Sequence, residues 1–248
     1  MLALDDFNNL EYLHFASIDS TNEEVKRRFP VYEKDILVIS DSQTSGKGRK
    51  GRSFFSPPDT GLYLSFGTRS KFAFGDVLKV TSATAVIASR ALRKILNVDA
   101  CIKWVNDIYF EDKKVCGILA ECFLNPDSSI DIVVGIGINL SICDFPEDIK
   151  NKAGSLNVKQ NELYRYKSLI ASNIARELQR FFKNPDGFEY IDDYKRFSCV
   201  LGKDVVLLDA KGEFARGRVV DFDKDGAILI DDGSKIENYD NGELSLKF

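Results

Sequence analysis

The chain has 248 residues, of which 44% are hydrophobic and 29% are charged, and its formal net charge at pH 7 is -4. Such a chain can build a sizeable core, either as one large domain or as a domain plus a small module. The acidic balance (pI about 5.3) argues against a general nucleic-acid-binding surface. No stretch approaches the roughly 20 apolar residues of a membrane span, and the first fifteen residues lack the pattern of a secretory signal. We therefore expect a cytoplasmic protein.

Cysteine and histidine usage narrows the chemistry further. The five cysteines are odd in number, form no C-x-x-C motif, and are expected to be reduced and mostly buried: Cys101, Cys116, Cys122, Cys143 and Cys199. His14 is the single histidine, which argues against a histidine-based triad or a multi-histidine zinc site. Proton transfer or nucleophile activation must then use Lys, Asp, Glu, Tyr or the substrate itself.

Helix and strand patterns alternate in the first part of the chain. A helix is predicted over 19–29, where Ser20 and Glu23 have the spacing of a capping box. Short apolar runs predict strands at 36–40 and 62–66. From about Val77 to Leu96, apolar residues recur at three- and four-residue spacing and predict an amphipathic helix.

The rest of the chain predicts a meander of hairpins, two helices and a small β module. Strand patterns occupy 101–105, 107–110, 115–124 and 131–138. Helices are predicted over 162–182 and, shorter, near 187–199. After Gly202, short β runs at 204–209, 213–222, 227–231 and 234–239 alternate with Asp/Gly turns, which favours a small barrel. We expect one domain over 1–199 and a second over 200–248.

Residues 45–54, the basic loop, concentrate positive charge on this acidic chain. The loop holds four cations and three glycines: Lys47, Arg49, Lys50 and Arg52, and Gly46, Gly48 and Gly51. The charges suit a bound anion, and glycines let backbone N–H groups approach a phosphate closely. The spacing satisfies G-x-G-x-x-G, but the following Arg-Ser-Phe-Phe-Ser-Pro-Pro cannot start the helix that a dinucleotide site requires. The loop alone is equally compatible with a solvated basic turn.

Three further segments combine polar and strand-forming residues. The segment 103–107 (KWVND) offers a cation, an amide and a carboxylate to a ligand, or is simply a hairpin turn. Lys114 begins an apolar strand that reaches Glu121, so its ammonium either lies at a hairpin tip or points into a cleft. Gly135 and Gly137 interrupt an apolar strand, which implies close approach of another backbone or a ligand.

The order and spacing of these segments resemble the biotin protein ligase family. The matching strings are GKGRKGRSF (46–54), KWVND (103–107), KKVCGILAE (113–121) and GIGIN (135–139), with Ser-Thr-Asn (20–22) where the family has an early substrate-binding triplet. The resemblance covers 15–248 and is to the short form that lacks an N-terminal DNA-binding domain. It implies an α+β fold: a mixed, largely antiparallel sheet backed by helices (a class II synthetase-like catalytic domain) and a C-terminal SH3-like β-barrel.

The resemblance also implies an activity. Members of the family join biotin to ATP as biotinyl-5′-AMP, release pyrophosphate, and pass biotin to one lysine of a biotin carboxyl carrier protein. Biotin and ATP are then substrates, Mg²⁺ is the expected metal, and neither a nucleic acid nor a membrane is an expected partner. The protein is expected to be a monomer or a homodimer, with a basic loop that closes over the bound ligands.

Residue roles follow from the same resemblance. Catalytic roles fall to Arg49, Lys114, Lys47 and Asp107, the last also a candidate Mg²⁺ ligand. Biotin binding falls to Ser20, Thr21, Asn22, Gln43, Gly46, Lys47, Gly48, Arg49, Lys114 and Gly117. Nucleotide binding falls to Arg49, Arg52, Phe54, Lys103, Asn106 and Asn139.

The chain departs from the family pattern at three positions. Lys47 replaces an arginine, which loses bidentate geometry. Phe54 replaces a tryptophan, which keeps a stacking surface of smaller area. Val105 replaces a proline, which frees the turn before Asn106. Three other interpretations compete: a lipoate- or octanoyl-transferring enzyme of the same superfamily, an RNA-binding module, and a biotin-sensing repressor.

Overall fold

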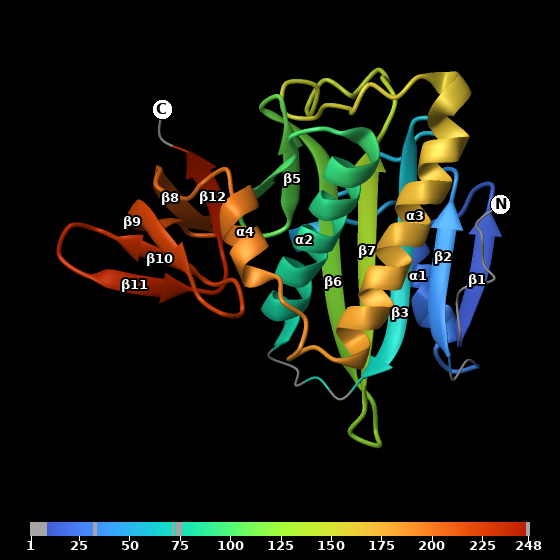
Figure 1. The fold of residues 1–248 in the computed structure, drawn as a ribbon, viewed down its shortest axis with the longest axis horizontal. Coiled ribbons are helices and arrows are strands. Elements are labelled where there is room, and N and C mark those ends of the chain that lie inside the picture. Colours follow the sequence, from blue (N-terminus) through green and yellow to red (C-terminus); the bar gives the residue numbers. More distant parts are fainter. Residues whose placement is uncertain (1–8, 32–33, 71, 73–75, 247–248) are drawn as a thin grey trace.

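The computed structural model of the protein describes residues 9–31, 34–70, 72 and 76–246, and all predicted site residues lie in these ranges. Its strands form a seven-stranded sheet and a separate five-stranded sheet. Helices accompany the larger sheet, so the predicted α+β class is confirmed (Figure 1).

The larger sheet has the order β1-β2-β3-β7-β6-β5-β4. Only the pairing of β1 with β2 is parallel among its described strands, and the rest is antiparallel. Its strands are β1 (Leu10–Phe15), β2 (Asp35–Ser40), β3 (Gly61–Ser70), β4 (Cys101–Lys103), β5 (Asp107–Phe110), β6 (Lys113–Leu124) and β7 (Ile130–Asn139).

Helices cover both faces of this sheet. Helices α2 (Val77–Leu96) and α3 (Gln160–Lys183) pack against each other and on one face, and α4 (Ile191–Phe197) packs on α2 (Figure 1). The short helix α1 (Thr21–Arg28) packs on β2, β3 and β7 from the other side. Because side chains alternate along a strand, residues of one strand serve two cores. In β2, Leu37 and Ile39 join the core under α2 and α3, whereas Ile36 and Val38 pack against α1.

The same alternation in β7 places the glycines of the GIGIN segment. Ile132, Val134 and Ile136 point into the core under α2 and α3. The intervening positions therefore face α1, with Val133 packed in the α1 core. Gly135 and Gly137 lie on the same face of β7 as Val133. Because glycine has no side chain, β7 contributes only backbone to the α1 face at these two positions.

The C-terminal part forms an antiparallel sheet of order β11-β10-β9-β8-β12. Its strands are β8 (Asp204–Asp209), β9 (Gly212–Phe222), β10 (Ile228–Asp231), β11 (Ile236–Tyr239) and β12 (Glu243–Leu246). The turn after β9 contacts the rest of the molecule: Trp104 Nε1 donates to the carbonyl of Gly226 (2.9 Å), and the Tyr190 hydroxyl donates to that of Lys224 (2.9 Å). Tyr194 packs edge-on against Phe222.

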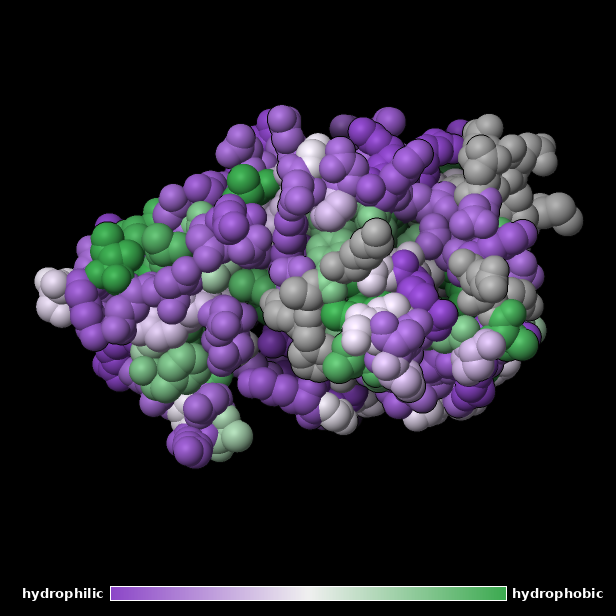
Figure 2. All heavy atoms as spheres, turned by 90° about the horizontal axis from the view of Figure 1, so that it is seen from below, coloured by the Kyte–Doolittle hydropathy of each residue, from purple (hydrophilic) through white to green (hydrophobic). Residues whose placement is uncertain are grey.

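The structure corrects the predicted capping box. Helix α1 follows Ser20, as expected, but no side chain caps its first turn. Glu23 instead binds Lys26 (2.7 Å) and Lys47 (2.6 Å), because a second cation from the basic loop draws its carboxylate away from the helix end. Among the described residues, no helix has both the length and the apolar composition to span a membrane. The face in Figure 2 is mostly hydrophilic, with separate hydrophobic patches.

Candidate active site

The basic loop and α1 enclose a cleft against the α1 side of β6 and β7. The cleft is lined by Ser20, Thr21, Asn22, Gln43, Lys47, Gly48, Arg49, Phe54, Leu64, Asn106, Lys114, Gly117, Ile118, Leu119, Gly135, Ile136 and Gly137. Five segments that are far apart in sequence therefore meet here, together with Gln43 and Leu64: the triplet 20–22, the basic loop, the 103–107 segment, and strands β6 and β7. Each of the four motifs that carried the family resemblance contributes at least one lining residue.

Two facing glycines form the floor of the cleft. Gly117 of β6 and Gly137 of β7 are cross-strand partners, and the ring of Phe54 lies over both. A Cβ at Gly137 would stand 2.5 Å from that ring, and one at Gly117 would stand 3.1 Å from it. At Gly135, a Cβ would stand 2.0 Å from Asn22 Oδ1. These strand positions are glycine because side chains from α1 and the basic loop occupy the space that a Cβ would need.

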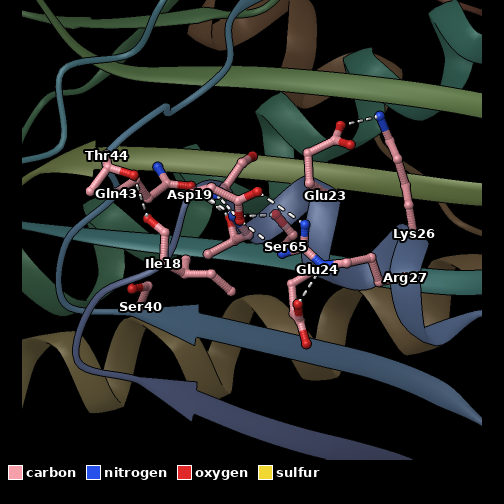
Figure 3. A network of polar contacts seen from close by, with 12 residues as sticks. Ile18, Asp19, Glu23, Glu24, Lys26, Arg27, Ser40, Gln43, Thr44 and Ser65 are labelled. Carbon is pink, nitrogen blue, oxygen red and sulfur yellow. Dashed lines mark hydrogen bonds and ion pairs between the residues drawn. The ribbon is translucent and has the colours of Figure 1, made fainter.

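A buried polar network holds the triplet at the start of α1. The Thr21 backbone N–H donates to Gln43 Oε1 (2.8 Å), and Gln43 Nε2 donates to the Ser56 hydroxyl (2.8 Å). Ser65 of β3 is fully buried, and its Oγ lies 2.6 Å from Asn22 Oδ1. Figure 3 shows the side chains of Gln43, Ser65 and Asp19 gathered near the start of α1, with Glu23 and Lys26 pointing toward each other.

Glu121 extends this network to the cations around α1. It accepts a hydrogen bond from Asn22 Nδ2 (2.8 Å) and pairs with Lys26 (2.8 Å). Lys26, and with it Lys47, holds the pKa of the Glu23 carboxyl below its usual value. Amide, hydroxyl and carboxylate groups thus approach the cleft in fixed positions, which suits a ligand with a polar, uncharged head group.

Arg49 differs from the other charged groups of the site in its partner. Lys47 pairs with Glu23 (2.6 Å), Lys114 with Asp107 (2.7 Å) and Arg52 with Glu243 of β12 (2.7 Å). Arg49 Nη1 instead donates to Asn106 Oδ1 (3.0 Å), a neutral amide, and no ion pair of Arg49 occurs within the described ranges.

The environment of Arg49 favours an anionic ligand. Its half-burial lowers the pKa of the guanidinium, opposed by the charges of Asp107 and Glu243. A guanidinium stays charged in proteins, so burial without a carboxylate leaves a positive charge that is poorly compensated. An incoming carboxylate or phosphate would supply that compensation with charge-assisted hydrogen bonds.

Asp107 lies beside the cleft lining rather than in it. Its Oδ1 is buried and pairs with Lys114 Nζ (2.7 Å). No group of three or more potential metal-ligating side chains occurs in the described part of the chain. Mg²⁺ commonly takes one or two carboxylates plus substrate phosphates, so a single carboxylate at this position fits that ion.

Four other predicted residues also stand outside the lining. Gly46 is buried at the base of the basic loop, where a Cβ would lie 2.5 Å from the Phe54 carbonyl. Arg52 turns toward β12, and Lys103 lies over the Tyr109 ring, 5.0 Å from its centroid. Asn139 Nδ2 donates to the carbonyl of Gly154 (3.0 Å) and ties β7 to the segment before α3.

Several site residues escaped prediction from the sequence. Leu64, Ile118, Leu119 and Ile136 line the cleft, and Ser65, Ser56 and Glu121 hold its polar groups. Leu64, Ile118 and Ile136 read as ordinary core residues, and serines in strands carry no distinctive pattern. Glu121 ended the matched KKVCGILAE string, and its place four residues beyond Gly117, on the same face of β6, was the available signal.

The cleft encloses only about 40 Å³. Sites for small organic ligands are typically several hundred Å³, whereas a volume of this size suits about one water molecule. The ring of Phe54 occupies the space above the glycine floor, so a larger ligand must displace it or move the basic loop.

These features define a ligase fold and site, and the chain belongs to the biotin/lipoate A/B protein ligase family, whose sequence model matches residues 14–139. The family resemblance predicted from the four motifs is thus confirmed. The bifunctional ligase/repressor BirA of Escherichia coli (strain K12) is 28% identical, over 93% of this chain and 72% of its own length. A biotin–[acetyl-CoA-carboxylase] ligase of Mycobacterium tuberculosis is 29% identical, over 84% of this chain and 78% of its own.

Solved structures give the same result. The biotin protein ligase from Aquifex aeolicus in complex with biotin and ATP superposes with a TM-score of 0.74 and 30% identity, covering 97% of this chain and 99% of that one. The likeness therefore extends over both sheets.

Proposed function

We propose that this protein is an ATP-dependent biotin–protein ligase. It activates biotin as biotinyl-5′-AMP and transfers biotin to a lysine of a biotin carboxyl carrier protein. The observation that carries the proposal is the half-buried, carboxylate-free cation of Arg49 beside a network of fixed polar groups. The Arg49 cation suits the carboxylate of biotin and the phosphate of ATP. The polar network suits the uncharged ureido head of biotin.

Activation must bring two anions together. A carboxylate oxygen of biotin attacks the α-phosphorus of ATP, the α–β phosphoanhydride bond breaks, and its electrons leave with pyrophosphate. Arg49, Lys47 and Lys114 offset the repulsion between the anions and stabilise charge that develops on the phosphate oxygens. A carboxylate is already nucleophilic, so this step needs no general base, which agrees with a site free of histidine.

Binding of the substrates rearranges ion pairs in this proposal. Lys47 leaves Glu23 and Lys114 leaves Asp107 as the ligand anions take over their partners. Asp107 is the residue that would hold Mg²⁺, which would supply charge neutralisation for the departing pyrophosphate.

The second reaction, transfer of biotin to the carrier, takes place in the same site. The amine of the carrier lysine attacks the biotinyl carbonyl, a C–N bond forms, and the bond from that carbon to AMP breaks. The amine proton leaves to Asp107 or to solvent. Ser20, Thr21, Asn22, Gln43, Gly46, Gly48 and Gly117 hold biotin, whereas Arg52, Phe54, Lys103, Asn106 and Asn139 serve the nucleotide.

Finer aspects of the architecture belong to the same proposal. Residues 1–199 form the catalytic domain, and the C-terminal sheet closes as an SH3-like barrel over 200–248. The carrier docks by adding a strand to β1, one of the two outer strands of the larger sheet, because Ser198 already bridges to Ile102 of the other outer strand, β4. We place the protein in the cytoplasm, as a monomer or a homodimer.

The direct test supplies the protein with biotin, Mg-ATP and a biotin carrier domain, followed by intact-mass analysis of that domain. We expect the carrier to gain one biotinyl group and a carrier with its acceptor lysine changed to arginine to gain none. The same experiment with lipoate in place of biotin tests the lipoate-transferring alternative, which predicts that the carrier gains a lipoyl group. The proposal is contradicted if the carrier stays unmodified and no pyrophosphate is released from biotin and Mg-ATP.

A further inference from the structure

A chain of four oxygen atoms links the polar side chains at the start of α1. It passes from Asn22 Oδ1 to Ser65 Oγ (2.6 Å), continues to Thr21 Oγ1 (2.7 Å), and ends at Gln43 Oε1 (3.1 Å). Ser65 is fully buried, whereas Thr21, Asn22 and Gln43 line the cleft. The two amide oxygens can only accept hydrogen bonds, and each hydroxyl carries one proton. Two protons therefore serve three contacts, and the chain is one donor short.

The backbone fixes the direction of the Gln43 amide at one end of this chain. The Thr21 N–H can only donate, so its 2.8 Å contact places the carbonyl oxygen of Gln43 toward Thr21. The Gln43 NH₂ group then donates to the Ser56 hydroxyl (2.8 Å), whose own proton goes to the Phe54 carbonyl (2.9 Å). Gln43 cannot turn round to supply the missing proton without leaving the Thr21 N–H unpaired.

A charged residue fixes the direction of the Asn22 amide at the other end. The Glu121 carboxylate only accepts hydrogen bonds, so the 2.8 Å contact with it must be made by Asn22 Nδ2. Ser65 does not decide the direction, because a hydroxyl can donate or accept. Glu121 is itself held by Lys26 (2.8 Å), which also binds Glu23 (2.7 Å). If the Asn22 amide turned round, Nδ2 would face Ser65 and supply the third proton of the chain.

We propose that Glu121 is a positioning residue that keeps this oxygen chain one donor short and so selects a ligand whose head group brings an N–H donor. Glu121 does not line the cleft and acts through Asn22. This role rests on the proposed function and makes the two N–H groups of the ureido ring the feature of biotin that the network recognises. Buried acceptors without a donor cost free energy, which a ligand N–H offsets. The dithiolane ring of lipoate has no N–H group and leaves that cost in place.

Glu121→Gln tests the direction of the chain with almost no change in shape. The new amide can donate to Asn22 Oδ1, so the Asn22 amide can turn round and complete the chain without a ligand. In the pyrophosphate assay, we expect KM for biotin to rise about tenfold, with KM for ATP and kcat within about twofold of the parent. Glu189→Gln, at an exposed glutamate between α3 and α4, is the matched control and should leave all three values unchanged.

A second substitution should restore biotin binding. Asn22→Asp alone sets two carboxylates against each other and should raise KM for biotin at least as much as Glu121→Gln does. In the double variant, the new glutamine amide donates to the new aspartate, whose other oxygen again faces Ser65 as an acceptor. KM for biotin should then return to within about threefold of the parent. Thermal melting followed by circular dichroism checks that each variant is folded.

Desthiobiotin tests whether the ureido ring is the group recognised, because it keeps both N–H groups but lacks the sulfur-containing ring. Glu121→Gln should raise KM for desthiobiotin and for biotin by the same factor, and an effect on biotin alone would remove the selection for N–H donors. A parent-like KM for biotin in Glu121→Gln, or a double variant no better than its single variants, would overturn the role of Glu121. A parent protein that releases no pyrophosphate from biotin and Mg-ATP would contradict the proposed function instead.

Discussion

Arg49 shows how a neutral neighbour can define the role of a charged residue. Among the charged groups around the cleft, it is bonded to the amide of Asn106, whereas Lys47 and Lys114 have carboxylate partners. A carboxylate partner must be displaced before a ligand anion binds, but an amide partner leaves the charge available. We therefore expect Arg49 to contribute more to the binding of developing negative charge than its neighbours in the basic loop.

Replacing Arg49 tests this difference. Arg49→Ala should lower the rate of biotinyl-adenylate formation about a hundredfold or more, as loss of a group that stabilises transition-state charge does elsewhere. Lys114→Ala should also reduce the rate sharply. Pyrophosphate release with biotin and Mg-ATP measures both. Lys50→Ala removes the same charge from an exposed position of the loop and should stay within about twofold of the parent. Comparable losses in Arg49→Ala and Lys50→Ala would refute the specific role of Arg49.

Gly135 provides a second test at the scale of one residue. Gly135→Ala places a Cβ where Asn22 Oδ1 now lies, 2.0 Å away, so the Asn22 amide must leave Ser65 and Glu121. We expect about tenfold weaker biotin binding in isothermal titration, because a network of polar groups loses its fixed geometry.

A double-mutant cycle separates this displacement from general damage to the strand. In an Asn22→Ala background the added methyl group has no amide to displace, so Gly135→Ala should cost little further affinity. Additive losses would mean that the two positions act independently.

The candidate site was only partly predictable from single residues. Charged and glycine residues stand out in a sequence because each is costly or unusual in a strand or loop. Arg49, Lys114 and Gly137 stood out in this way, and the family resemblance then supplied the roles of Arg49 and Lys114. Ser65 and Glu121 act through partners on α1, 43 and 99 residues away from Asn22. Such contacts depend on how α1 packs on the sheet, which local patterns do not specify.

At the scale of elements, the basic loop has few ties to the rest of the molecule. Its own backbone bonds, Gly48 to Arg52 (2.7 Å) and Phe54 to Gly46 (2.9 Å), fold it on itself. Side chains of Lys47, Arg49 and Arg52 anchor it outward, and the first and last of these contacts are exposed ion pairs of low strength. Together with a cleft too small for a vitamin, this arrangement implies that the loop moves during binding.

Limited proteolysis measures that movement. Trypsin should cut within 45–55 in the free protein, and biotin with Mg-ATP should slow the cleavage about tenfold or more as the loop closes over the ligands. The exposed hairpin at 210–211, which includes Lys211, serves as the internal control because its cleavage should not change. Equal rates at 45–55 with and without ligands would rule out ligand-induced closure.

Elements with a strong repeat were the ones that the sequence predicted well. Helix α2 spans Val77–Leu96 as predicted, and α3 exceeds its predicted range by two residues at the start and one at the end. Strands β1 and β12 were not predicted: β1 is an edge strand with mixed polarity, and β12 is four residues long. Edge and terminal strands form because a neighbouring strand offers hydrogen bonds, so their own composition is a weak guide.

At the scale of the whole molecule, the two sheets meet through a few specific contacts close to the proposed site. The 103–107 segment supplies one of them, since Trp104 is buried and its indole N–H reaches Gly226 in the turn after β9. Arg52 of the basic loop supplies another through Glu243 of β12. The C-terminal sheet therefore touches two of the segments that approach the cleft, and its position bears on their geometry.

Trp104→Phe tests the buried contact between the sheets. A six-membered aromatic ring is kept, but the side chain becomes smaller and the Gly226 carbonyl loses its buried donor, so we expect the free energy of unfolding to fall by about 1–3 kcal/mol. Urea unfolding followed by far-UV circular dichroism is the suitable measurement, because Trp104 is the single tryptophan and fluorescence would be lost with it. Tyr239→Phe removes an exposed hydrogen bond to Glu237 and should change stability by less than about 0.5 kcal/mol. If both variants unfold at the same urea concentration as the parent, the indole contact does not hold the two sheets together, and packing such as that of Tyr194 on Phe222 must do so instead.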